Sequence, residues 1–182
     1  MHYTQTEIDG VWLIEPKIHK DSRGYFFESY RKEQFAENIG AVDFVQENEA
    51  KSSFGVLRGL HYQRGIHSQA KLVRVITGSV LDVAVDLRLN SPTFGKHISM
   101  ELSEANKRQL FIPRGFAHGY LVLSEEAIFS YKVDNLYAPE SEASILFSDH
   151  DLKIDWPIAD FNLVLSEKDK VAPSFKEAEY FS

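Results

Sequence analysis

The sequence predicts an all-β protein, an antiparallel sandwich or barrel with a few short helices. Short apolar runs recur at close spacing between residues 71 and 147, with turn-forming residues between them, a pattern typical of many short strands. The best helix candidate is residues 32–39, where Phe35 and Ile39 share one face and Gly40 marks the end. No internal repeat or low-complexity linker divides the chain.

The 182 residues, 43% of them hydrophobic, fit one folded domain. Within it we expect an N-terminal arm over about residues 1–50, a barrel core over about 51–148 and an irregular or helical C-terminal segment over about 149–182. The start of the chain has no apolar leader, and no run approaches membrane-spanning length. We therefore expect a soluble, cytoplasmic protein without a membrane partner.

The charge balance restricts the possible partners. The chain has 20 Lys+Arg against 27 Asp+Glu, a net charge of −7. Such a protein repels nucleic acid unless it carries a basic patch, so we expect no nucleic-acid partner. An anionic substrate would have to meet a few well-placed cations. The absence of cysteine excludes disulfides, thiolate catalysis and cysteine-ligated zinc.

The N-terminal arm contains strand and turn signals. Residues 11–14 form a short apolar run, residues 21–24 a turn signal and residues 25–30 an aromatic run typical of a strand. In the next extended segment, alternation places Gln46 and Asn48 on one face. Two polar groups on one face of a strand are candidates for binding.

The barrel core begins with two strands. Residues 71–77 and 80–87 flank Gly78-Ser79, which we interpret as a hairpin turn. In the second strand the apolar residues share one face, and Asp82 and Asp86 lie on the other. Further strands are expected at residues 98–102, 109–112, 119–123, 127–133 and 144–147.

The chemically richest stretch is RGLHYQ at residues 58–63, with Lys71 shortly after it. Neutral His61 could remove a proton beside a carbonyl, and the Lys71 ammonium could hold the charge that forms on oxygen. The structural alternative is that His61 is a satisfied structural residue and that Arg58 pairs with a surface carboxylate.

A second constellation lies in PRGFAHG at residues 113–119, whose spacing of Pro, Gly and His matches the second sequence motif of cupin barrels. His61 falls where the first cupin motif belongs, but Gln63 replaces its second histidine and no acidic residue follows before Gly78. Two histidines, His61 and His118, are a poor site for a divalent metal. The pattern indicates a cupin pocket without a metal, and the alternative for His118 is a structural turn residue.

From about residue 11 to residue 174, the chain resembles the dTDP-4-dehydrorhamnose 3,5-epimerase family. The matching motifs are DSRGYFFE at 21–28, QEN at 46–48, LRGLHYQ at 57–63, QAKLV at 69–73, PRGFAHG at 113–119, YK at 131–132, YAPESE at 137–142 and LSEKD at 165–169. Each is weak alone, but eight in the family's order make a specific signal. The loop at residues 64–68 lacks prolines that some members have there.

The resemblance implies a cupin-type antiparallel jelly roll that needs no metal and no other cofactor. It also implies a homodimer in which N-terminal strands are exchanged, so that Arg23 and Glu28 would complete the partner's site. The implied substrate is a dTDP-4-keto-6-deoxyhexose, whose C4 ketone acidifies the hydrogens at C3 and C5. The implied reaction inverts both centres through an enolate.

Four residues match the family's catalytic groups. His61 matches the general base, and Asp169 the carboxylate that orients it and stabilises the imidazolium. Lys71 matches the cation beside O4, and Tyr131 the acid on the opposite face. The alternative for Tyr131 is a core aromatic of its strand.

The resemblance also implies the binding residues. Cationic side chains would contact the diphosphate and nucleotide, which solves the problem of an acidic protein binding an anion. The implied contacts are Arg23, Arg58, His118 and Lys168 for the diphosphate and nucleotide, Glu28, Gln46, Asn48 and Glu142 as polar contacts, and Tyr137 stacked on the thymine.

Several other functions are compatible with part of the pattern. A sibling enzyme could act at only one of C3 and C5, and a cupin ketoisomerase could move the ketone instead. A metal cupin oxygenase is disfavoured by the missing ligands. A non-catalytic sugar-binding cupin would not need His61, Lys71, Tyr131 and Asp169 together.

Overall fold

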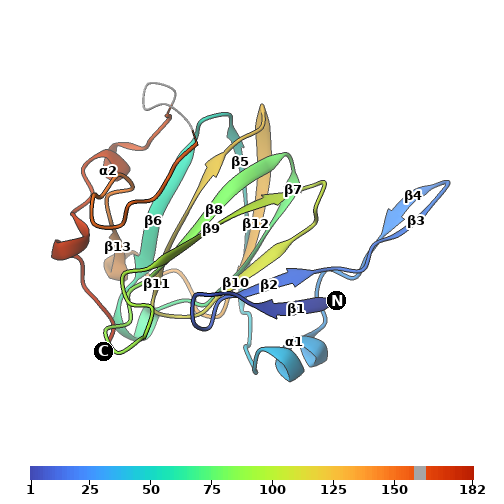
Figure 1. The fold of residues 1–182 in the computed structure, drawn as a ribbon, viewed down its shortest axis with the longest axis horizontal. Helices are drawn as coiled ribbons and strands as arrows, with labels where there is room; N and C mark the ends of the chain where they lie inside the picture. The colour runs from blue at the N-terminus through green and yellow to red at the C-terminus, as the bar shows by residue number, and fades with distance from the viewer. Residues whose placement is uncertain (158–162) are drawn as a thin grey trace.

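The computed structural model describes residues 1–157 and 163–182. Two antiparallel sheets face each other, and a separate two-stranded hairpin projects away from them (Figure 1). The six-stranded sheet has the order β1-β2-β10-β7-β12-β5 and the five-stranded sheet the order β13-β6-β11-β8-β9. The prediction of an all-β protein with antiparallel sheets and a few short helices is confirmed.

The strands of the six-stranded sheet are β1 (His2–Gln5), β2 (Trp12–Glu15), β5 (Gln46–Ser53), β7 (Lys71–Thr77), β10 (Gln109–Ile112) and β12 (Glu126–Val133). Those of the five-stranded sheet are β6 (Leu57–Gln63), β8 (Ser79–Asp86), β9 (His97–Ser103), β11 (Phe116–Val122) and β13 (Glu142–Ser144). The projecting hairpin consists of β3 (His19–Asp21) and β4 (Gly24–Phe26). The helices are α1 (Lys32–Asn38) and α2 (Glu167–Lys170), with short 3₁₀ turns at Gly65–His67, Pro139–Ser141 and Phe175–Glu177.

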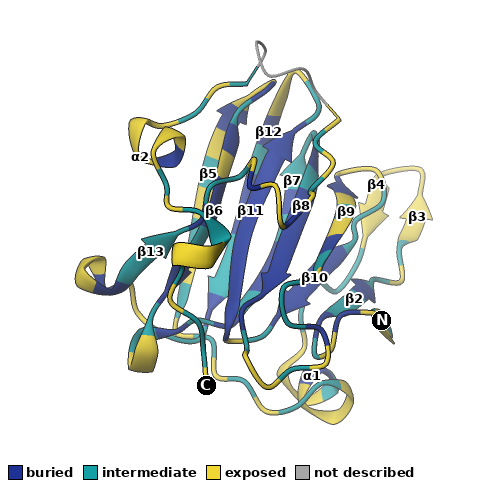
Figure 2. Cartoon of the chain, turned by 60° about the vertical axis from the view of Figure 1, so that its left-hand side comes forward, coloured by how far each residue is buried: buried dark blue, intermediate teal, exposed yellow. Residues whose placement is uncertain are grey.

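The middle of the five-stranded sheet is buried on both faces. Every residue of β11 is buried, and Figure 2 shows this strand in dark blue along its length. Phe116 and Val122 pack between the sheets, whereas Ala117 packs on the opposite face. That opposite face is covered by apolar side chains of the C-terminal segment, including Phe175 and Phe181. The segment therefore acts as a third layer over this sheet.

The predicted hairpin at Gly78-Ser79 is wrong. β7 pairs with β10 and β12, whereas β8 pairs with β9 and β11, so the chain crosses from one sheet to the other at this point. Gly78 has φ +78°, and a Cβ there would lie 2.1 Å from the carbonyl oxygen of Glu126. A Gly-Ser turn signal specifies a change of direction, but it does not specify which sheet the next strand joins.

Strand β8 is buried on its polar face as well as on its apolar face. The apolar face of β8, with Val83 and Val85, packs against the C-terminal segment. Asp82 and Asp86 lie on the other face and are both 0% exposed. The two carboxylates therefore need polar partners inside the protein.

The N-terminal arm largely follows the predictions. Helix α1 begins at Lys32 as expected, and buried Phe35 packs against Phe111 with ring centroids 5.1 Å apart. The turn between β3 and β4 is confirmed. The expected aromatic strand is shorter than predicted, because pairing ends at Phe26 and Tyr30 packs against Phe35 instead. Among the described residues, no helix is long and apolar enough to cross a membrane.

Candidate active site

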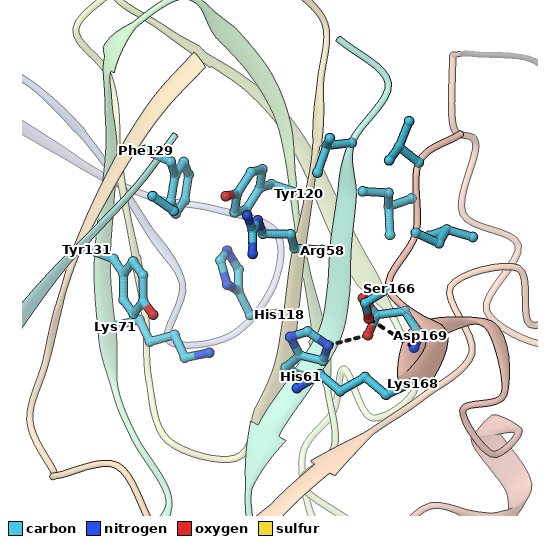
Figure 3. A pocket seen from close by; sticks show the side chains of 15 residues that line it. Arg58, His61, Lys71, His118, Tyr120, Phe129, Tyr131, Ser166, Lys168 and Asp169 are labelled. Atoms are coloured by element: carbon cyan, nitrogen blue, oxygen red, sulfur yellow. Dashed lines mark hydrogen bonds and ion pairs between the residues drawn. The ribbon is translucent and has the colours of Figure 1, made fainter. Parts of the chain in front are cut away.

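A cavity of about 460 Å³ lies between the two sheets, beside the C-terminal segment (Figure 3). Each of the three layers contributes polar side chains to its lining. They are Lys71 and Tyr131 from the six-stranded sheet, Arg58, His61, His118 and Tyr120 from the five-stranded sheet, and Ser166, Lys168 and Asp169 from the C-terminal segment. The cavity therefore collects all four residues matched to catalytic groups.

Two glycines bring the histidine-bearing strands together. A Cβ on Gly59, which has φ +144°, would lie 2.5 Å from the Cα of Gly119. The register between β6 and β11 shifts at this close approach, and His61 then stands opposite His118. No larger residue fits there, so the glycine pair fixes the spacing of the two imidazoles.

His61 forms a dyad with Asp169. Its Nε2 lies 2.5 Å from Asp169 Oδ1, and Ser166 Oγ donates to Oδ2 at 2.7 Å. Burial favours a higher pKa for Asp169, but the hydrogen bonds from His61 and Ser166 hold that pKa below its ordinary value. An ionised carboxylate accepts hydrogen bonds, so the geometry assigns the proton of neutral His61 to Nε2 and leaves Nδ1 as the basic atom.

Ser166 explains how the carboxylate is held. It is the N-cap of α2, and its side chain also accepts from the backbone N–H of Asp169. Asp169 is 2% exposed, whereas the His61 side chain keeps 26% of its surface exposed. The base is thus accessible while its carboxylate is sealed.

Lys71 and Tyr131 come from the sheet opposite His61. Figure 3 shows the Lys71 side chain extending into the cavity, with Tyr131 and His61 on either side of it in this view. Burial lowers the pKa of Lys71 to about 8, although Asp82 and Glu142 oppose the change. Burial also raises the pKa of Tyr131, so its phenol remains a proton donor at neutral pH.

His118 forms a second histidine–carboxylate pair, in the barrel interior. Its Nε2 lies 2.9 Å from Asp82 Oδ2, and the histidine is 7% exposed. Burial lowers the pKa of His118 despite the carboxylate, so the ring is neutral at pH 7. Its assignment as a diphosphate contact stays a prediction, and Nε2 is already engaged by Asp82.

A polar network surrounds the cavity on the α2 side. Lys168 Nζ donates to Glu142 Oε1 at 2.6 Å, and the Tyr137 hydroxyl donates to Oε2 at 3.2 Å. Burial favours a higher pKa for Glu142, but the Lys168 ammonium holds it below its ordinary value. Tyr137 is 56% exposed, so its ring face is available for stacking.

The remaining binding candidates lie along β5 and β6. Arg58 Nε donates to Ser52 Oγ at 3.2 Å, which anchors one edge of the guanidinium. Gln46 Nε2 donates to Asn48 Oδ1 at 2.8 Å. Alternation places both residues on the same face of β5 as Ala50, which lines the cavity.

Arg23 and Glu28 are not brought to this cavity. Arg23 lies at the tip of the projecting hairpin, where it pairs with Asp21 at 2.6 Å. Glu28 follows the hairpin and pairs with Arg31 at 2.7 Å. Neither residue is among those that line the cavity of its own chain.

The residue patterns alone did not single out several residues of the site. Tyr120 and Ser52 were missed because they look like ordinary strand residues. Ser166 could have been found, because a serine three residues before an aspartate is an N-cap signal. Among residues 1–157 and 163–182, no group of three or more His, Cys, Asp or Glu side chains is placed to hold a metal ion.

The chain is similar to known sugar-nucleotide epimerases over nearly its whole length. The family model described as dTDP-4-dehydrorhamnose 3,5-epimerase matches residues 5–177. A protein of that name from Shigella flexneri is 51% identical over all of this chain and 99% of its own length. The crystal structure of RmlC from Legionella pneumophila, a 3,5-epimerase in complex with dTDP-4-keto-L-rhamnose, superposes with a TM-score of 0.94 at 49% identity, covering 98% of this chain and 94% of that one.

A more distant structural relative differs in its reaction. ChmJ from Streptomyces bikiniensis, described as a 3'-monoepimerase in complex with dTDP-quinovose, has a TM-score of 0.86 and 37% identity over 93% of this chain and 85% of its own. The full-length matches at about half identity nevertheless agree with one another. On this evidence, the chain belongs to the dTDP-4-dehydrorhamnose 3,5-epimerase family.

Proposed function

We propose that the protein is an isomerase that inverts C3 and C5 of dTDP-4-dehydro-6-deoxy-D-glucose, giving dTDP-4-dehydro-L-rhamnose in dTDP-L-rhamnose biosynthesis. Family membership supports this assignment. The observation that carries it is the His61–Asp169 dyad on one side of the cavity, with Lys71 and Tyr131 contributed by the opposite sheet. Inversion needs acid and base on opposite faces of one sugar ring.

The proposed chemistry begins at His61. Its Nδ1 removes the proton from a carbon beside the C4 ketone, and the C–H electrons move toward O4 to form an enolate. Asp169 stabilises the resulting imidazolium, and the Lys71 ammonium stabilises the oxyanion. Tyr131 then donates a proton to the same carbon from the other face, and solvent restores the protonation of both groups.

Substrate binding is proposed to rest on cations around the cavity. Arg58 and Lys168 would contact the diphosphate, with His118 beside them, and thus offset the net charge of −7. Gln46, Asn48 and Glu142 would supply neutral and anionic contacts, and exposed Tyr137 would stack on the thymine.

The projecting hairpin is proposed to complete the site of a second subunit in a homodimer. Tyr25 and Phe26 are 57% and 72% exposed there, and aromatic side chains on a projecting hairpin are suited to an interface. In this arrangement Arg23 and Glu28 would contact the partner's substrate.

A mixing experiment tests this exchange. Arg23→Ala and His61→Asn variants should each be weak alone, but a mixed dimer has one site that contains both wild-type residues. After exchange of subunits, activity should recover to about a quarter of wild type, because half of the dimers are mixed and each has one intact site. If each hairpin serves its own subunit, mixing restores nothing.

The proposed reaction is tested by incubation with dTDP-4-keto-6-deoxyglucose in deuterated water, with NMR detection of label. Deuterium at both C3 and C5, with inversion of both centres, supports the proposal. The labelling should persist after metals are removed with a chelator. The likeness to ChmJ favours one alternative, a monoepimerase, which would invert a single carbon. A ketoisomerase would move the carbonyl, and a binding protein would leave the substrate unlabelled.

A further inference from the structure

Asp82 is a buried carboxylate to which the proposed chemistry assigns no role. It is 0% exposed, and its Oδ1 has no hydrogen-bond partner among the described residues. Of the buried side-chain polar atoms described, the Tyr120 hydroxyl is the other without a partner. The two residues stand directly opposite each other on β8 and β11. A buried carboxylate oxygen without a hydrogen-bond partner is rare in a packed interior.

A buried carboxylate is costly unless a positive charge compensates it. His118 gives Asp82 one hydrogen bond at 2.9 Å but carries no charge when neutral. Lys71, like Arg58 and Lys168, is a cation that lines the cavity, and it projects into the cavity from the opposite sheet. Glu142 also acts on Lys71, but it is already paired with Lys168. The other charged or titratable side chains that line the cavity are Arg58, His61, His118, Tyr120, Tyr131, Lys168 and Asp169.

We propose that Asp82 is a positioning residue, which holds His118 with its Nε2 proton toward β8 and supplies the negative charge that keeps Lys71 an ammonium. Its effect on turnover rests on the proposed function, because only an enolate-forming reaction needs that ammonium. Asp82 is not among the residues that line the cavity, whereas its neighbours His118 and Tyr120 are.

Burial and the Asp82 carboxylate act on the pKa of Lys71 in opposite directions. Burial lowers the pKa of Lys71 to about 8, and Asp82 is the largest influence in the opposite direction. Without the carboxylate charge, Lys71 should lose its proton at a lower pH. A neutral amine stabilises an enolate oxygen less well than an ammonium, so the rate should decline at a lower pH as well. A carboxylate that merely packs His118 would not move this decline.

The matched control is Asp86, on the same strand and the same face of β8. It is also 0% exposed, but its carboxylate is bonded to Arg88, Ser91 and Thr93 rather than to cavity residues. Asp82→Asn and Asp86→Asn each remove one buried charge with little change of shape. Both should lower thermal stability, so stability alone does not decide the question.

The deciding measurement is kcat against pH for wild type and the two variants. In Asp82→Asn we expect the alkaline limb to move down by about one pH unit. In Asp86→Asn the limb should stay in place. A limb that Asp82→Asn leaves unmoved overturns the proposal.

Two NMR measurements separate this inference from the proposed reaction. In wild-type protein, ¹⁵N spectra should find His118 protonated at Nε2 and bare at Nδ1, and the reverse tautomer overturns the proposal even if Asp82→Asn does not fold. The titration midpoint of ¹³C-labelled Lys71 should fall in Asp82→Asn. An unchanged midpoint contradicts the proposal whether or not wild type turns over, whereas a failure of the proposed reaction appears as wild-type protein without turnover.

Discussion

The molecule contains the same pair of side chains in two different settings. His61 and Asp169 join a barrel strand to the C-terminal helix, and the imidazole is open to the cavity. His118 and Asp82 join two neighbouring strands, and their side chains are only 8% and 0% exposed. We call His61–Asp169 the open pair and His118–Asp82 the closed pair. In the open pair the imidazole can gain a charge during turnover, whereas burial keeps the imidazole of the closed pair neutral. Solvent access, rather than residue type, decides which pair can act as a base.

The largest expected effect comes from removing the open imidazole. His61→Asn should lower kcat by about 10²–10⁴-fold and abolish deuterium incorporation at both carbons, because no enolate forms. Binding of dTDP is the control for a folded site. If C5 still exchanges at the wild-type rate while dTDP binds normally, the base is elsewhere.

Removing the charge of the open carboxylate should be nearly as damaging. Asp169→Asn leaves His61 in place but no longer stabilises its imidazolium, so we expect kcat to fall by about 10²–10⁴-fold with KM little changed. A loss confined to KM would instead assign Asp169 to substrate binding.

Tyr131→Phe tests the proposed acid, which lies on the sheet opposite His61. The base and the oxyanion donor remain, so hydrogen exchange with solvent should continue from the base's face while inversion is impaired. Isotope position and product stereochemistry, read together by NMR, separate the two events. Equal loss of exchange and inversion would contradict an acid role for Tyr131.

Arg58 lies on the same strand as His61 but belongs to neither pair. Arg58→Ala should raise the Kd for dTDP at least about tenfold, since each charge-assisted hydrogen bond contributes about 1.5–3 kcal/mol. Calorimetry at low salt measures this, with Arg64→Ala as a control because Arg64 pairs with Glu179 outside the cavity. An equal loss of dTDP affinity in both variants would mean that Arg58 acts through the net charge of the protein and not through a contact with the diphosphate.

The smallest effect should come from Ser166, which holds the Asp169 carboxylate of the open pair. Ser166→Ala removes both an N-cap and a hydrogen bond to Asp169, so the free energy of unfolding should fall by about 0.5–2 kcal/mol. The pKa of Asp169 is lowered in the folded protein, so its stabilisation is present above 3.8 and is lost as pH falls through the folded value.

The difference in the free energy of unfolding between wild type and Ser166→Ala should therefore become smaller at acidic pH. Urea unfolding at neutral pH and at the lowest pH where both proteins fold would measure it. A gap independent of pH would mean that Ser166 acts through the helix cap alone.

The sequence predicted the side chains of the site better than their surroundings. His61, Lys71 and Arg58 could be singled out because they carry polar chemistry next to an apolar strand. Asp169 could be assigned through the family resemblance alone, because it lies 108 positions from His61 and no local pattern joins them. The inward direction of Asp82 could not be predicted, because both faces of β8 are buried.

Strand locations were also more predictable than strand partners. The alternation that locates β7 and β8 is a local property, and so is the turn at Gly78. Sheet membership depends on contacts with β9 to β12, which lie far along the chain. That is why the expected hairpin is instead a crossing between sheets.

The crossing at Gly78 has a consequence for how fast the protein folds. Because most consecutive strands from β5 onward enter different sheets, pairs such as Gln46 with Val133 and Leu57 with Leu121 must close long loops before the sheets are complete. Chains dominated by such distant pairings fold in roughly milliseconds to seconds rather than microseconds. The cavity, whose walls come from both sheets, should therefore form late, and ligand binding in stopped-flow refolding should not precede the recovery of native fluorescence.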